Sequence, residues 1–248
     1  MRNRLVSTFA GICLLLGEAP LRAQNGRAQS FEVSSTERLP CAARGTVHID
    51  GSYGYLSVDG WDAPEVEIAV TKTTDRFFGP SQQDAARRRL EQIRVTAERT
   101  EESLLTVKTT CPSRNGTWAP PLKATTQNGV TVDTRIHVPS GSHLVIHHDN
   151  GYVWVSGLAG DIEIHSHTGD MIVVLSDAAS YAIDARTKLG SITSDFDGKR
   201  LSRFLLGTHF AGLAQAPAHR VCLRMGRGSI TIKKDSPPAV PKTSLGTR

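Results

Sequence analysis

Three observations predict an all-β chain built of stacked repeats. The stretch 144–173 holds two copies of one unit, offset by eighteen residues, in which short alternating apolar strands flank a glycine. The same pattern recurs at three other places in the chain. The segments between the repeats also contain strands in which apolar residues alternate with polar ones. Repeats of this length and content are typical of a β-solenoid, also called a β-helix, rather than of a catalytic domain.

The repeat is defined by positions counted from its glycine. Apolar residues stand seven and five positions before it and, with one exception, two and four positions after it. We expect each glycine to allow a positive φ or a close approach between chains. We also expect the units to stack as five rungs about 4.8 Å apart, with inward columns such as Leu144, Ile162, Ile183 and Val221. The glycines that share this register are Gly54, Gly151, Gly169, Gly190 and Gly228.

The amino terminus predicts export. Arg2 and Arg4 precede the apolar run 5–16, and small residues follow up to Ala23, so residues 1–23 have the pattern of a signal peptide. Cys13 lies inside the apolar run, where a lipid-modified cysteine is not expected. We therefore expect a secreted protein of the periplasm or cell surface, without stable membrane insertion once the signal is removed.

Charge disfavours nucleic acid as a partner. Residues 1–23 hold three of the 29 basic and one of the 24 acidic residues, so the remainder has a net charge of +3. Nucleic-acid-binding domains are usually much more basic and concentrate that charge on one face.

Three cysteines follow the signal peptide. Two of them are expected to pair in an oxidising compartment, and Cys41 with Cys111 is one candidate pair, which leaves Cys222 as a thiol. The connectivity stays open, because spacing alone does not determine it. No CxxC pair or other cysteine and histidine spacing of a structural zinc site is present.

The chain divides into segments around the repeat. After a polar leader at 24–39, a single domain spans 40–234, and a proline-containing disordered tail covers 235–248. Strict alternation predicts a strand at 130–138 that stops at Pro139, and extra length between the last two rungs predicts a loop at 198–220.

An insertion at 73–128 interrupts the repeat. It is expected to contain a helix at 81–93 that begins with a capping box of Ser81 and Asp84, strands at 94–97 and 104–109, and a loop at 112–127. Arg87 to Arg89 lie on this helix, and they represent either a phosphate or lipid contact or a solvated face.

The stretch PSGSHLVIHHDNGYVWVSGLAGDIEIHSHTGDMIVVL resembles an exported bacterial family of putative adhesins of unknown function. The strand that ends at Val138 and Pro139 matches the lead-in of that family, and the glycines from Gly151 onward match its repeats. The resemblance covers residues 40–234. It implies an exported solenoid of β-helix type and supplies no catalytic residues.

A histidine cluster raises the question of metal binding. Stacking in chain order puts His147 beside His165, followed by Arg186 and Arg224, and it puts Asp149, His167 and Lys188 in a parallel column. Imidazoles and a carboxylate on adjacent rungs can bind a transition metal. The alternative is that these side chains stack on one another at the surface. We expect no metal and no other cofactor, because no second shell that would orient the imidazoles is evident.

The same columns suggest a basic binding face. Regularly spaced charges suit an extended anionic polymer such as an acidic envelope polysaccharide, and aromatic rings can stack on sugars. The alternative is a surface that serves solubility. The candidate binding residues are Tyr152, Trp154, His165, Arg186, Lys188, Arg224 and Arg227.

Catalysis is disfavoured. Asp161, Asp170 and Lys188 could be assembled into a polysaccharide-acting site, but both aspartates follow glycines in turns, where local hydrogen bonding is expected. No nucleophile elbow, HExxH motif or phosphate loop is present. The sequence favours an exported, non-enzymatic, adhesin-like binding or scaffolding module whose partner is an envelope glycan or a surface protein. The alternatives are a purely structural exported protein and, third, a polysaccharide-acting β-helix enzyme.

Overall fold

The computed structural model describes residues 30–74, 82–101, 103–110, 126–127, 130–176, 181–203, 207–212 and 216–235. In these ranges the chain is almost entirely strand, with one helix, which confirms the all-β prediction. The expected signal peptide at 1–23 lies outside the described residues, as does the expected tail beyond residue 235.

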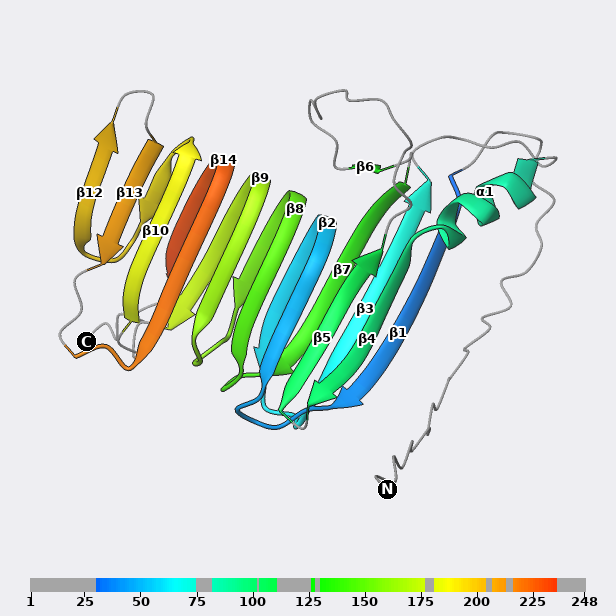
Figure 1. Ribbon diagram of the computed structural model, residues 1–248, viewed down its shortest axis with the longest axis horizontal. Coiled ribbons are helices and arrows are strands. Elements are labelled where there is room, and N and C mark those ends of the chain that lie inside the picture. Colours follow the sequence, from blue (N-terminus) through cyan, green and yellow to red (C-terminus); the bar gives the residue numbers. More distant parts are fainter. Residues whose placement is uncertain are drawn as a thin grey trace, which may run out of the picture.

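The strands stand side by side in one long row (Figure 1). Their order is β1-β3-β7-β2-β8-β9-β14-β10-β13-β12, so the sheet runs from one edge strand to another without closing. The strands are β1 (Glu32–Pro40), β2 (Thr46–Trp61), β3 (Glu65–Thr74), β4 (Arg94–Glu101), β5 (Leu104–Thr110), β6 (Thr126–Gln127), β7 (Val130–Pro139), β8 (His143–Ser156), β9 (Ile162–Ser176), β10 (Tyr181–Leu189), β11 (Ile192–Ser194), β12 (Gly198–Arg203), β13 (Gly207–Gly212) and β14 (His219–Asp235).

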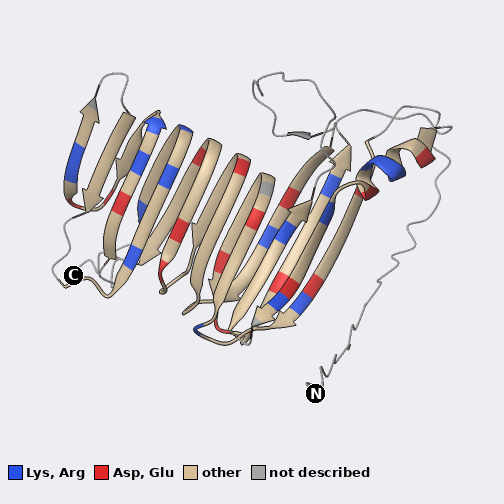
Figure 2. Cartoon of the chain, viewed as in Figure 1, with Lys and Arg blue, Asp and Glu red and all other residues tan. Residues whose placement is uncertain are grey.

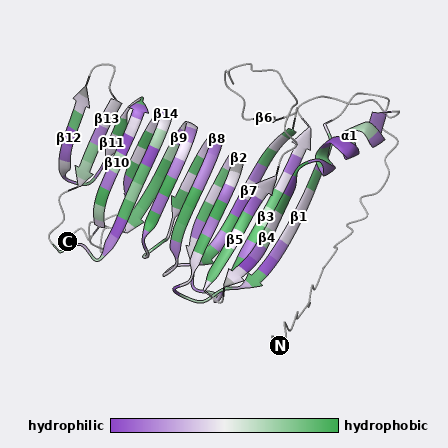
Figure 3. Ribbon diagram, viewed as in Figure 1, coloured by the Kyte–Doolittle hydropathy of each residue, from purple (hydrophilic) through white to green (hydrophobic). Residues whose placement is uncertain are grey.

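The long strands change their inward face at the repeat glycine. On β8, Leu144 and Ile146 are buried before Gly151, and Val153 and Val155 are buried after it. The buried positions therefore switch from even to odd numbers at the glycine, and both halves of the strand contribute to one core. The alternation of apolar and polar residues along each strand is visible in Figure 3.

Inward columns of apolar side chains connect the rungs. Parallel pairing aligns Leu144 with Val47 on one side and with Ile162 on the other, and the column continues through Val221 to Ile183. All of these residues are buried. Burial of a side chain of this size stabilises the fold by roughly 1.5–3 kcal/mol.

The repeat glycines form a column of their own. Gly151 pairs with Gly54 and Gly169, Gly228 pairs with Gly169, and Gly190 lies against Gly228. Gly169 has a φ of +130°, and a Cβ there would overlap the carbonyl oxygen of Gly151. The backbone bends and approaches its neighbour at a point that has no room for a side chain.

The expected stacking of rungs in chain order is wrong at one place. β14 lies between β9 and β10, so the last rung in the sequence is the fourth in space. β14 is 17 residues long and β9 is 15, and they pair over nearly their whole length. β10 is followed by the short β11, so this interrupted rung offers fewer backbone partners and takes the outer position.

The insertion at 73–128 extends the sheet. As expected, it contains two strands and a helix, α1 (Gln83–Glu91). β5 pairs in parallel with the first part of β2, and β4 pairs with β5. The residue before α1 is Gln82, which makes no side-chain capping bond, and Ser81 lies outside the described residues. Of the expected loop at 112–127, only the short strand β6 is described.

The helix α1 exposes most of its arginines. It buries Ala86 and Leu90, whereas Arg87 and Arg88 are exposed and Arg89 is half-buried. The helix packs beside β3 near one end of the row (Figure 1). This placement agrees with a solvated arginine face.

Two segments for which we predicted no strand, the leader and the loop at 198–220, contain strands. The second part of the leader forms β1, which pairs antiparallel with β3. The segment expected as a loop at 198–220 contains the hairpin β12–β13, which pairs with β10. Both lie at edges of the sheet, and β1 is exposed at nearly every position. An edge strand as exposed as β1 has no apolar alternation to reveal it.

Charged residues of both signs are distributed over the strands (Figure 2). None of the helices in the described part of the chain combines the length and apolar character needed to cross a bilayer.

Candidate functional site

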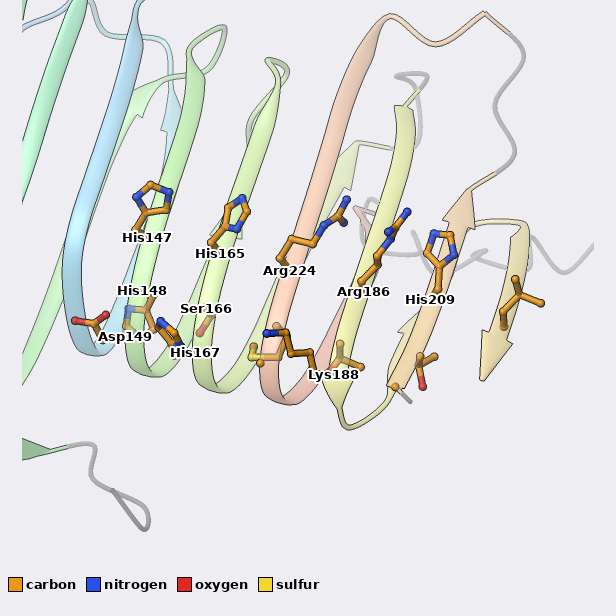
Figure 4. A pocket seen from close by; sticks show the side chains of 16 residues that line it. His147, His148, Asp149, His165, Ser166, His167, Arg186, Lys188, His209 and Arg224 are labelled. Atoms are coloured by element: carbon orange, nitrogen blue, oxygen red, sulfur yellow. The ribbon is translucent and has the colours of Figure 1, made fainter. Parts of the chain in front are cut away.

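An open groove of about 760 Å³ crosses the outer face of β8, β9, β14 and β10 and reaches β13 (Figure 4). Most of its charged and imidazole side chains come from positions before the repeat glycines. The exposed or half-buried ones are His147, Asp149, His165, His167, Arg186, Lys188, His209 and Arg224, and the almost fully buried His148 also belongs to the lining.

One cross-strand row supplies the centre of the groove. Four of its members stand four residues before their repeat glycines, so strand pairing places each beside the equivalent residue of the next rung. The fifth, His209, joins the row because β13 pairs antiparallel with β10. Because β14 precedes β10 in space, Arg224 and not Arg186 is the neighbour of His165. Figure 4 shows these side chains following one another from strand to strand. The row reads His147, His165, Arg224, Arg186 and His209.

A second row lies two residues further along the strands. Asp149 and His167 line the groove at one end and Lys188 lines it further along (Figure 4). Gly226 occupies the equivalent position on β14, between His167 and Lys188. The expected parallel column therefore exists, with a gap where β14 carries no side chain.

Asp184 organises the cationic end of the first row. Its carboxylate accepts hydrogen bonds from Arg224 at 2.6 Å and from Arg186 at 3.3 Å. The Nε2 atom of His209 lies 2.9 Å from the same carboxylate. Burial raises the pKa of the Asp184 carboxyl, but the hydrogen bonds and charges of its basic neighbours outweigh that effect, and its pKa lies below the usual value. One carboxylate thus contacts three basic side chains and offsets only part of the positive charge of the two arginines.

Glu163 has a similar role on β9. Its carboxylate lies 2.9 Å from Nε2 of His165. The hydrogen bond to His165, together with the charges of neighbouring histidines, lowers the pKa of Glu163 despite some burial. Glu163 therefore stays ionised and orients His165.

His148 faces the other way, into the core. It is 1% exposed, and burial lowers its pKa to about 4, although a hydrogen bond with the backbone of Asn150 favours the charged form. His148 is thus neutral at ordinary pH. Its neighbours in the sequence, His147 and Asp149, point outward because side chains alternate along a strand.

A third group of side chains lies beside the groove on β2. Asp50 pairs in register with His147, and His48 lies two residues earlier on the same face. The rings of His48 and His147 meet edge to face with centroids 5.1 Å apart, and His165 lies 5.5 Å from His147 on the other side. His48, Asp50 and His147 present ligand atoms within 4.8 Å of one another.

The structure brings together only some of the binding residues expected from the sequence. His165, Arg186, Lys188 and Arg224 line the groove, whereas Arg227 is exposed beyond it. Tyr152 and Trp154 lie on the second half of β8, after the bend at the glycine, and do not line the groove. Tyr152 is instead the register partner of Tyr55, which is also exposed.

The two aspartates considered for catalysis accept hydrogen bonds from backbone amides of a neighbouring strand. Asp161 accepts a hydrogen bond from the backbone amide of Arg220 at 2.8 Å. Asp170 accepts one from the amide of Ser229 at 3.1 Å. Both carboxylates thus bridge β14 to the chain around β9, which is a structural role.

Only one cysteine of the expected disulfide lies in the described residues. Cys41 is buried, and this burial raises the pKa of its thiol despite the nearby charge of Arg99. Cys111 lies outside the described residues, so the pairing stays a prediction. Cys222 is half-buried in β14.

Sequence reasoning missed several polar residues of this face. Asp50 stands four residues before Gly54, so the repeat register, extended to the first rung, would have placed it beside His147. His48, Glu163 and Asp184 stand six residues before their glycines, in the next outward row. His209 carried no signal, because it belongs to the hairpin that has no repeat.

No family model matches the sequence, and no curated protein matches it. Solved structures with similarity include a putative cell adhesion protein from Clostridium sporogenes, with 8% identity, a TM-score of 0.49, and coverage of 82% of this chain and 100% of that one. A putative adhesin from Bacteroides fragilis has 10% identity and a TM-score of 0.26 over 81% of this chain and 97% of that one. A putative adhesin from Parabacteroides merdae has 11% identity and a TM-score of 0.27 over 80% of each chain. Their names describe those proteins, and the function proposed below rests on the groove.

Proposed function

We propose that this protein is an exported, non-enzymatic, adhesin-like binding module that holds an anionic polymer, such as an acidic envelope polysaccharide, in its groove. One observation carries the proposal: a row of basic and imidazole side chains runs across five neighbouring strands and lines an open groove (Figure 4). The proposal includes a β-solenoid fold of the kind suggested by the repeat, and removal of residues 1–23 as a signal peptide.

The spacing of the row supports an extended ligand. Neighbouring strands lie about 4.8 Å apart, so the row presents one basic or imidazole group per strand. A polymer with a repeating negative charge can contact several of these groups at once, and the individually weak attractions add. A small anion would use only one or two of them.

The electrostatics of the groove favour binding over catalysis. Two of the acidic residues next to the row are engaged, Asp184 with Arg224 and Glu163 with His165. A carboxylate held ionised by a hydrogen-bonded base is a poor general acid at neutral pH. The same contacts fix the positions of the basic groups before a ligand arrives, which lowers the entropic cost of binding.

A second candidate is a purely structural exported protein. It is favoured by the fact that Asp184 already links three basic residues from β14, β10 and β13. In that case the row serves to hold the last rungs together. Binding measurements separate the two candidates.

The test measures retention of the full chain on immobilised polygalacturonate, with neutral dextran as the reference matrix. We expect retention on polygalacturonate at low ionic strength that weakens as salt is added, because salt screens exposed charges. The triple variant Arg186→Gln, Lys188→Gln, Arg224→Gln should elute at markedly lower salt.

The matched control removes three positive charges elsewhere, by Arg87→Gln, Arg88→Gln and Arg89→Gln on α1. It should elute close to the parent protein. Equal losses in both triple variants would show attraction to net charge alone, and no retention of the parent would favour the structural candidate.

A further inference from the structure

The outer face of β2 and β8 carries a compact set of nitrogen and oxygen ligands at the end of the groove. His48 and Asp50 point outward from one strand, two residues apart, and His147 points outward from the next. Parallel pairing of β2 and β8 aligns Asp50 directly with His147. Two adjacent, hydrogen-bonded strands therefore position all three side chains.

Two distances within this set are close to those between ligands of one metal ion. Nε2 of His48 lies 3.4 Å from Nδ1 of His147, which in turn lies 3.6 Å from Oδ1 of Asp50. Both separations exceed the 2.7–3.2 Å of ordinary N–H···O hydrogen bonds. Two ligands bound tetrahedrally to zinc at roughly 2.0–2.1 Å are about 3.3 Å apart. Two of the three separations are therefore close to an edge of a coordination tetrahedron, and the three ligand atoms all lie within 4.8 Å of one another.

We propose that His48, Asp50 and His147 bind a divalent transition-metal ion, with Zn²⁺ as the representative case. Two imidazoles and one carboxylate suit zinc and its neighbours in the first transition series, whereas magnesium and calcium prefer oxygen ligands throughout. The side chains of Asp50 and His147 are 41% and 48% exposed, so the remaining coordination positions face solvent. This site does not depend on the polymer-binding function proposed above.

The surroundings define the limits of the site. His165 is the next ring in the row, but its Nε2 atom is held by Glu163 at 2.9 Å. We therefore assign three protein ligands and place His165 outside the coordination shell. Lys108 pairs in register with Asp50 on β5, so a positive charge lies on the side away from His147. Partial exposure and this nearby cation predict weaker binding than at a buried structural zinc site.

The test titrates zinc chloride into the metal-free full chain without a polyhistidine tag, by isothermal titration calorimetry. We expect saturable binding of one zinc ion per protein chain at the site formed by His48, Asp50 and His147. His48→Gln and His147→Gln should each weaken it by more than about tenfold, because each removes one of three ligands.

Three further variants test which imidazoles belong to the site. His167→Gln and His209→Gln remove imidazoles of the groove that lie outside the proposed set, and they should leave the affinity within about twofold. His165→Gln should retain binding within a few-fold. Circular dichroism of every variant checks that the fold is intact.

Several outcomes would overturn the proposal. The parent protein could show no saturable heat, or His48→Gln could bind zinc as well as the parent does. A loss in His165→Gln as large as that in His48→Gln would move the site to the His147–His165 pair and exclude the three-ligand assignment made here.

Discussion

Gly228 lies directly against Gly169, and a Cβ at Gly228 would overlap the carbonyl oxygen of Gly169. The same relationship joins Gly169 to Gly151 and Gly151 to Gly54. Successive rungs thus leave no room for a side chain at these glycines, and the register of the glycines is also the register of the other cross-strand rows.

Replacement of Gly169 by alanine should destabilise the fold severely. The substitution adds a clash with backbone to a φ of +130°, which L-residues rarely adopt, and strain of that kind alone costs about 1–3 kcal/mol. We expect a loss in the free energy of unfolding at or above the upper end of that range, measured by urea denaturation. Gly51→Asn is the control, because Asn tolerates a φ of +67° and the nearest atom is 3.0 Å away. Similar losses in both variants would contradict the close approach at the glycine column.

The buried imidazole of His148 should make stability depend on pH. Burial lowers its pKa in the folded state to about 4, so the folded protein binds fewer protons than the unfolded chain between the usual pKa of 6.5 and 4. His148 therefore contributes stability that is complete above pH 6.5 and falls as the pH decreases towards 4, by about 3 kcal/mol in total.

The comparison of the parent with His148→Phe measures this contribution. Phenylalanine keeps an aromatic ring at this position but has no titrating group. The slope of the free energy of unfolding against pH between 6.5 and 4 should therefore decrease. His167→Gln, which changes an exposed imidazole, should keep the slope of the parent. An unchanged slope in His148→Phe would mean that His148 titrates normally.

The position of β14 can be tested by cross-linking. Thr168 on β9 pairs in register with Arg227 on β14, so the double variant Thr168→Cys, Arg227→Cys should form a disulfide under mild oxidation. Leu189 on β10 lies one strand further away, at about twice the strand spacing of 4.8 Å, which exceeds the roughly 7 Å limit between Cα atoms of a disulfide. Thr168→Cys with Leu189→Cys should therefore stay reduced. Peptide mapping by mass spectrometry identifies the bond, and the opposite pattern would restore the stacking in chain order.

Asp184 should limit the affinity of the groove for anions. Its carboxylate lies among Arg224, Arg186 and His209 and offsets part of their charge. Asp184→Asn should therefore elute from polygalacturonate at higher salt than the parent, with a modest decrease in thermal stability because three contacts are weakened. Elution at lower salt would show that Asp184 matters mainly by holding Arg224 in position.

Much of the local structure follows from the sequence alone. Alternation around Gly151 and Gly169 predicted which side chains face inward, and the strand that ends at Pro139 was found where its pattern placed it. The helix in the insertion and the two strands after it were also confirmed. These features depend on neighbours two to five residues apart, which the sequence displays directly.

The candidate site was predictable only in part. The register of the glycines brought His147, His165, Arg224 and Arg186 into one row, as expected. It did not reveal His209, because the hairpin β12–β13 carries no copy of the glycine repeat. The register also did not show that Tyr152 lies outside the groove. The bend at Gly151 turns the second half of β8, which carries Tyr152, away from it.

The sequence by itself determined the register of each rung, because inward and outward positions alternate within a strand and reset at a glycine. Only the tertiary structure decided which rungs are neighbours, because pairing depends on matching the lengths of strands far apart in the chain. β14 pairs with β9 along almost its full length, and this choice places Arg224 beside His165. The same kind of long-range pairing, between β2 and β8, brings Asp50 to His147 across almost a hundred residues of sequence.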